Sequence, residues 1–139
     1  MSSQSTLKEI VLLIDAEGIR RYAELTNDFN PIHVDPEFAA RSEMWGVIAH
    51  GTLSLNLIWQ SLAATVGVQE LQHLDLQVRF KAPVRIGDRV AAGGRRTDTG
   101  YEVYVRNQHG TNVIEGSATR RQASEHENDQ AGRTDRSQR

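Results

Sequence analysis

The chain has 139 residues, a formal net charge of -2 and no cysteine. Its length fits one domain with a modest core, and the lack of cysteine excludes disulfides, thiolate metal ligands and a cysteine nucleophile. The charge gives no reason to expect nucleic acid as a partner, and no apolar run approaches the roughly 20 residues that span a membrane. The first residues contain no apolar signal segment, so we expect a cytoplasmic protein.

The first third of the chain predicts one strand and two helices. Residues 7–14 are a short apolar strand candidate, and Asp15 is the expected N-cap of a helix over residues 16–25. A loop over residues 26–35 follows. A proline at the first helical position then predicts a short helix over residues 36–41.

The middle and the end of the chain predict a buried helix followed by strands. A helix over residues 52–66 is apolar nearly all round, which is typical of a helix that other elements bury. Residues 71–83, 89–98, 101–107 and 112–121 are strand candidates with turns between them. We expect these strands to form an antiparallel meander against the helix, which is an α+β arrangement.

The last 18 residues differ from the rest in composition. Residues 122–139 contain no aromatic and no large aliphatic side chain, so they cannot bury enough apolar surface to offset the entropy of ordering. We therefore expect one domain over residues 1–121 and a disordered polar tail.

The loop over residues 26–35 carries the side chains best suited to moving protons. Asp28 and His33 are an acid and an imidazole that can exchange protons near neutral pH. Pro31 fixes its own φ and disfavours the helical region for Asn30, so we expect a rigid, irregular loop of the kind that often holds catalytic groups. Taken alone, Asp28 more often caps a turn and His33 is more often structural.

Three blocks of sequence together resemble the MaoC-like, (R)-specific enoyl-thioester hydratase/dehydratase family. They are Tyr22-Ala23-x-x-Thr26-x-Asp28-x-Asn30-Pro31-Ile32-His33-x-Asp35, then Ile48-Ala49-His50-Gly51-x-Leu53, then Phe80-Lys81-Ala82-Pro83-Val84-x-x-Gly87-Asp88. The resemblance implies the hot-dog fold, a curved antiparallel sheet wrapped around a long central helix. The third block also occurs in hot-dog thioesterases, whereas the first two are specific for the hydratase branch.

The resemblance also implies a reaction and roles for three catalytic residues. The substrate would be a trans-2-enoyl thioester of coenzyme A or acyl carrier protein, or the (R)-3-hydroxyacyl thioester in the reverse dehydration. Asp28 and His33 would share the reacting water. The backbone N–H of Gly51, at the start of the long helix, would point at the thioester carbonyl, where the helix dipole favours negative charge.

Further residues are candidates for substrate binding. Asn30 holds either the loop or the water through its amide, and His50 contacts the ligand or supports the loop. Met44 and Trp45, which add bulk before the second block, and Leu53 are expected to shape the acyl pocket.

Metal and nucleotide sites are not expected. Asp28, His33 and Asp35 are close in sequence, but the chain lacks the regular imidazole spacing of common metal sites, and Asp35 is better explained as a helix cap. No glycine-rich nucleotide motif follows a strand, so we expect no cofactor.

The sequence leaves two alternative functions open and also predicts an oligomeric state. The chain could be a hot-dog acyl-CoA thioesterase, or a non-catalytic subunit of a hetero-oligomeric dehydratase. A sheet wrapped on one helix leaves an open edge, and proteins of this family resemble dimers, so we expect a homodimer or a dimer of dimers.

Overall fold

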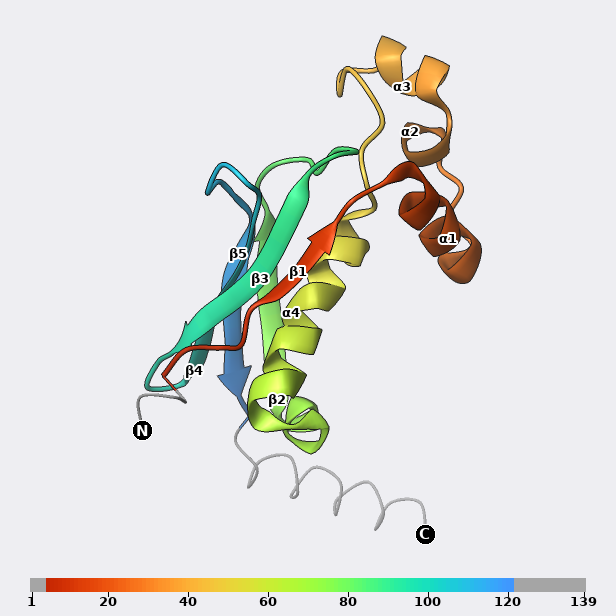
Figure 1. Ribbon diagram of the computed structural model, residues 1–139. Helices are drawn as coiled ribbons and strands as arrows, with labels where there is room; N and C mark the ends of the chain where they lie inside the picture. Colours follow the sequence, from red (N-terminus) through yellow and green to blue (C-terminus); the bar gives the residue numbers. More distant parts are fainter. Residues whose placement is uncertain (1–4, 122–139) are drawn as a thin grey trace, which may run out of the picture.

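A five-stranded antiparallel sheet lies against one long helix in the computed structural model, which describes residues 5–121 (Figure 1). The predicted tail over residues 122–139 lies outside the described residues. The sheet runs in the order β1-β3-β4-β5-β2 and confirms the expected hot-dog arrangement. Its strands are β1 (Ile10–Leu13), β2 (Leu74–Phe80), β3 (Arg89–Arg96), β4 (Gly100–Arg106) and β5 (Asn112–Arg120).

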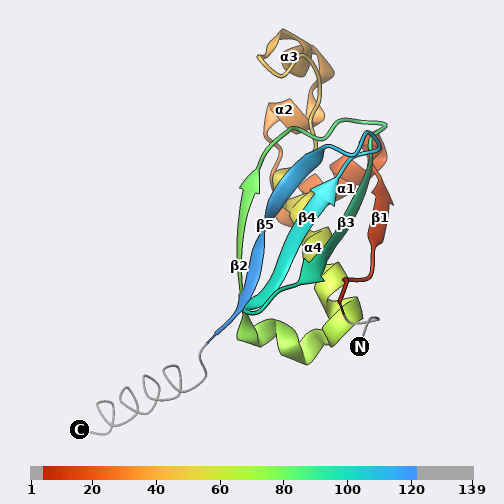
Figure 2. The same ribbon diagram turned by 90° about the vertical axis from the view of Figure 1, so that its left-hand side faces the viewer.

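The predicted meander is correct for β3, β4 and β5 but wrong for β2. Strand β2 pairs with β5 along its whole length, from Leu74 opposite Arg120 to Phe80 opposite Ile114. The free side of β3 is taken by β1, so β2 has no place there. The connection over residues 81–88 therefore crosses the end of the sheet, and β1 and β2 form its two opposite edges (Figure 2).

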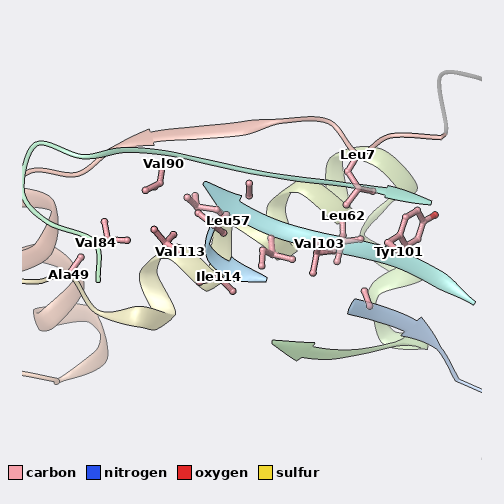
Figure 3. Packing of buried hydrophobic residues seen from close by; sticks show 14 of the residues in the cluster. Leu7, Ala49, Leu57, Leu62, Val84, Val90, Tyr101, Val103, Val113 and Ile114 are labelled. Carbon is pink, nitrogen blue, oxygen red and sulfur yellow. The ribbon is translucent and has the colours of Figure 1, made fainter. Parts of the chain in front are cut away.

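The core lies between the sheet and helix α4 (Gly51–Val66). Leu57 and Leu62 of the helix are buried, and Val103 and Val113 of the sheet lie in the same apolar layer (Figure 3). The other side of α4 carries polar, exposed residues such as Gln60, so only one face of the helix is buried in this chain. None of the described helices is long and apolar enough to cross a membrane.

Three helices gather beyond the end of the sheet at which α4 begins (Figure 1). They are α1 (Ala16–Thr26), α2 (Pro31–Val34) and α3 (Pro36–Arg41). The predicted N-cap of α1 is confirmed, because an Asp15 carboxylate oxygen accepts from the Gly18 N–H at 2.7 Å. The carboxylate of Asp35 likewise caps α3, which confirms its structural explanation.

The expectation of an irregular loop over residues 26–35 is partly wrong. Pro31 opens the one-turn helix α2, because a proline needs no partner for an N–H at the first helical position. The Asn30 side chain caps this turn by accepting from the Ile32 N–H at 3.1 Å. A second difference is the 3₁₀ helix η2 (Val68–His73), which occupies the beginning of the predicted strand over residues 71–83.

Candidate active site

A cavity of about 350 Å³ opens at the N-terminal end of α4. This volume is near the lower end of the range for small-molecule sites. Most of its wall is apolar, and its polar members are two histidines, one serine and one lysine. The lining residues are His33, Met44, Ile48, Ala49, His50, Gly51, Ser54, Phe80, Lys81, Ala82, Pro83, Val84 and Ile114.

A larger hollow of about 650 Å³ lies over strands β3, β4, β5 and β2 and is lined mainly by charged and polar residues of the sheet, among them Arg79 and Glu102. It includes none of the residues predicted for the site. We therefore place the candidate site at the smaller cavity, whose wall includes the predicted residues His33, His50 and Gly51.

The structure brings Asp28, His33 and His50 together. One carboxylate oxygen of Asp28 and one ring nitrogen of each histidine lie within 4.8 Å of one another. The two imidazole rings stack, with centroids 3.9 Å apart and an interplanar angle of 27°. Asp28 is exposed, His33 is half-buried and His50 is buried, so the group extends from the surface into the cavity.

Hydrogen bonds to carbonyl groups select one tautomer for the neutral form of each ring. His33 Nδ1 lies 2.7 Å from the Ile48 carbonyl oxygen. A carbonyl can only accept, so Nδ1 carries the hydrogen and Nε2 of the neutral ring has a free lone pair. The same argument applies to His50, whose Nε2 donates to the Asp28 carbonyl oxygen at 2.9 Å and whose Nδ1 is therefore the acceptor.

The Asp28 carboxylate is held loosely. Its Oδ1 accepts from the Asn30 N–H at 3.3 Å, and the Asp28 N–H donates to the Ala23 carbonyl at 3.0 Å. Asn30 itself is exposed and uses its side-chain oxygen to cap α2. The structure thus gives Asn30 a part in shaping the loop, while the carboxylate stays open to a further partner.

Tyr22 links α1 to the start of α4 and was not predicted as part of the site. Its hydroxyl donates to Thr52 Oγ1 at 2.7 Å and accepts from Asn56 Nδ2 at 3.3 Å. Its ring meets the His50 ring edge-on, with centroids 5.1 Å apart. Tyr22 opens the first sequence block, and this position could have indicated its contact with the site.

Gly51 is the first residue of α4 and lines the cavity, as its predicted role requires. A Cβ at this position would lie 2.8 Å from Cε1 of Phe80. The missing side chain therefore lets the Phe80 ring lie close to the beginning of the helix.

Trp45 and Leu53 are not brought to this cavity. Trp45 has a φ of 60° and is 82% exposed. Leu53 lines a separate hollow between β1 and α1. Met44, which was expected with Trp45 to shape the pocket, does line the cavity, and so does Ser54, which was not predicted. Ser54 follows His50 by one helical turn, and this spacing could have indicated its position.

The donor set of the histidine pair does not suit a metal ion. An imidazole binds a metal through an in-plane lone pair, with the ion about 2.0–2.1 Å from the nitrogen. The two ring planes are stacked at 27° with their centroids 3.9 Å apart, so one ion cannot lie in the plane of both rings at bonding distance from each. A lone pair beside a carboxylate and an apolar cavity suits proton transfer on a bound organic substrate instead.

The family follows from the sequence comparison. The model of the "MaoC like domain" matches residues 3–119. The chain belongs to this family. A similar curated protein is the 3-hydroxybutyryl-CoA dehydratase of Methylorubrum extorquens, which is 38% identical over 75 residues, covering 54% of this chain and 48% of that protein.

Two further relatives of this MaoC-like chain carry related names. The (R)-specific enoyl-CoA hydratase of Aeromonas caviae is 36% identical over 77 residues, covering 55% of this chain and 58% of the relative. The mitochondrial 3-hydroxyacyl-[acyl-carrier-protein] dehydratase of Arabidopsis thaliana is 29% identical over 117 residues, covering 77% of this chain and 69% of that relative. The chain thus spans about half the length of the first two relatives.

Solved structures support the fold of this MaoC-like chain. An (R)-hydratase from A. caviae superposes with a TM-score of 0.69 at 25% identity, over 85% of this chain and 96% of the other. The R-hydratase PhaJ1 from Pseudomonas aeruginosa superposes with a TM-score of 0.68 at 25% identity, over 85% of this chain and 82% of the other. The hot-dog fold expected from the sequence is therefore confirmed.

Proposed function

We propose that this chain hydrates trans-2-enoyl thioesters with (R) specificity, or dehydrates the corresponding (R)-3-hydroxyacyl thioesters. The observation that carries the proposal is the approach of the Asp28 carboxylate to the ring of His33, which lines an apolar cavity at the first turn of α4. Membership of the MaoC-like family and the names of the relatives support the same chemistry. The acyl carrier would be coenzyme A or acyl carrier protein.

Hydration adds the oxygen of one water to C3 and one proton to C2. A water between Asp28 and His33 would be oriented by the carboxylate and by the free lone pair of His33 Nε2. The Ile48 carbonyl keeps the hydrogen on Nδ1, so the ring presents the correct nitrogen to the water. The pair moves one proton off the attacking water and delivers one to C2, so the enzyme returns to its starting state.

Gly51 would stabilise the thioester oxygen as charge moves onto it. Its N–H stands in the first turn of a 16-residue helix, where amides lack intrahelical partners and the dipole favours negative charge. Loss of one such donor costs on the order of 3 kcal/mol of transition-state stabilisation. A backbone donor cannot be removed by a side-chain change, so this role is tested best through its neighbours.

The direct test is turnover of enoyl thioesters by the purified chain. Crotonyl-CoA and a panel of longer and branched enoyl thioesters, on both carriers, would be followed by loss of the enoyl absorbance. We expect Asp28→Asn and His33→Ala each to reduce kcat at least about 100-fold while the fold is kept. Asp75→Asn is a matched control, because Asp75 is an exposed carboxylate on β2, away from the cavity.

Other outcomes would point to the alternatives. Thiol release from a saturated acyl-CoA would identify a thioesterase. Activity that appears only with a second, different chain would identify one subunit of a hetero-oligomeric dehydratase. No turnover of any enoyl or 3-hydroxyacyl thioester, alone or with such a chain, would reject the proposed reaction.

We also propose that two copies of the chain pair as a homodimer, alone or within a dimer of dimers. Strand β2 is an edge of the sheet, with its outer backbone groups unpaired among the described residues. Large apolar side chains near α2 and α3 are exposed, namely Phe29, Val34, Phe38, Met44 and Trp45. Light scattering at micromolar concentration tests this, and a monomeric mass would contradict it.

The cytoplasmic location of the protein stays a prediction, which fractionation of source cells would test.

A further inference from the structure

Two buried polar atoms of the cavity wall have no hydrogen-bond partner within residues 5–121. They are Nδ1 of His50 and Oγ of Ser54. Ser54 is 1% exposed, so its hydroxyl cannot form a hydrogen bond with bulk water in place of a protein partner. Native structures rarely leave such groups unpaired, because the desolvation of each one is unfavourable. Both residues line the cavity, which indicates that an occupant of the cavity is the missing partner.

A second serine on the same helix shows that an unpaired hydroxyl is not a general property of α4. Ser61 is 0% exposed, and its Oγ donates to the Lys8 carbonyl oxygen at 2.5 Å. The two serines are seven residues apart, so they lie on the same side of the helix. One hydroxyl therefore fastens the helix to the chain before β1, while the other remains available at the cavity.

The position of Ser54 matches that of the proposed oxyanion donor. Ser54 follows Gly51 by three residues, so both lie on one face of α4. Both line the same cavity. In the neutral tautomer of His50 the orphan Nδ1 is an acceptor and cannot pair with a carbonyl, whereas the Ser54 hydroxyl is a donor and can.

We propose that Ser54 donates its hydroxyl hydrogen to the thioester carbonyl oxygen of the substrate, as a second donor beside the Gly51 N–H. The inference rests on the proposed function and adds a contact residue to it. Ser54 forms no covalent bond and releases no proton. It stabilises the negative charge that develops on this oxygen when the water attacks C3.

The kinetic test compares Ser54→Ala with Ser54→Thr and with Ser61→Ala as the matched control. We expect Ser54→Ala to lower kcat about 100-fold on the best enoyl thioester, with KM changed less than about threefold. The threonine variant keeps the hydroxyl and should retain activity to within about tenfold of the wild type. Ser61→Ala should keep the wild-type kcat.

The stability of the same variants separates a substrate contact from a structural one. Removal of an unpaired hydroxyl should leave the melting temperature of Ser54→Ala equal to or above that of the wild type. Ser61→Ala should melt lower, because the Lys8 carbonyl loses its partner. A fall in melting temperature in Ser54→Ala as large as in Ser61→Ala would show a structural hydroxyl and overturn the inference.

Binding of cinnamoyl-CoA gives a readout that does not depend on turnover. Its absorbance moves to longer wavelength when the carbonyl is polarised, so the shift on binding should be smaller in Ser54→Ala than in the wild type and in Ser61→Ala. An active wild type with an unchanged kcat and an unchanged spectral shift in Ser54→Ala would overturn the inference alone. A wild type that turns over no enoyl or 3-hydroxyacyl thioester, alone or with a second chain, would overturn the proposed function and this inference together.

Discussion

His50 Nε2 donates to the main-chain carbonyl oxygen of Asp28 at 2.9 Å, across 22 positions of the chain. This bond ties the N-cap residue of α4 to the segment that carries the proposed acid. Because the His50 ring also stacks on His33, one buried side chain contacts both members of the proposed pair. The geometry of that pair therefore depends on a residue that need not touch the water itself.

His50→Ala should lower both stability and activity. The substitution removes a buried ring and its hydrogen bond, so we expect the free energy of unfolding to fall by about 3 kcal/mol. Activity of the folded fraction should fall at least about tenfold, because small misplacements of catalytic groups are costly. Urea unfolding and kcat/KM measure the two effects.

The control for this substitution is His73→Ala. His73 is exposed at the end of η2, so its loss should change neither quantity. Unchanged activity in folded His50→Ala would mean that the loop keeps its geometry without this bond.

The sequence predicted much of the scaffold because its signals are local. The cap at Asp15 and the strand over residues 101–107 depend on neighbouring residues alone, and both appear as expected. The pairing of β2 with β5 depends instead on which strand takes the free edge of β3. No local pattern specifies that choice, so the predicted meander wrongly included β2 as a neighbour of β3.

The site was predicted best where one motif carried it. The first sequence block placed Asp28 and His33 near each other, and the structure brings His50 to them through contacts that no spacing reveals. The residues of the cavity wall were harder to predict, because whether Trp45 points inward depends on the backbone conformation of its turn. Its φ of 60° directs the chain differently from a helix or a strand, and the ring is exposed.

Asn27→Gly should stabilise the protein by about 0.5–1 kcal/mol. Asn27 ends α1 with a φ of 56° and a ψ of 36°, a left-handed conformation that glycine adopts without steric cost. Asparagine tolerates this conformation only in part, because unlike glycine it has a Cβ. Urea unfolding measures the change.

A glycine elsewhere in the same helix should have the opposite effect. Glu24→Gly, at an exposed interior position of α1, should lower stability by about 1 kcal/mol. A loss of stability in Asn27→Gly would show that the asparagine side chain stabilises the turn by an interaction of its own.

Asn112→Ala should raise the pKa of Glu115. Asn112 Nδ2 donates to Glu115 Oε2 at 2.9 Å, and this hydrogen bond is the main reason why the pKa of Glu115 lies below its ordinary value. Partial burial opposes the shift, and the positive charges of Lys81 and Arg79 add to it. An NMR titration of the carboxyl group would measure the change.

The sign of the linked stability effect follows from this direction. A carboxyl whose pKa is lowered by folding stabilises the protein above its unfolded pKa, and the effect is lost as pH falls through the folded pKa. High salt should weaken the contribution of Lys81 and Arg79 but leave that of Asn112 nearly intact. An equal pKa of Glu115 in both proteins would contradict the assigned cause.

Gly51→Ala should act through the Phe80 ring. The new Cβ would lie 2.8 Å from Cε1 and 3.1 Å from Cδ1 of that ring, so the ring must move. Phe80 is 56% exposed at the end of an edge strand and can turn away, so we expect a loss of only about 1 kcal/mol in the free energy of unfolding. In a Phe80→Ala background the same substitution should not change the free energy of unfolding, because the clash is gone.

The coupling between the two sites in a double-mutant cycle should therefore be about 1 kcal/mol. Gly110→Ala, where a Cβ meets open space, should cost the same in both backgrounds, and an equal cost of Gly51→Ala in both would show that the ring does not require this glycine.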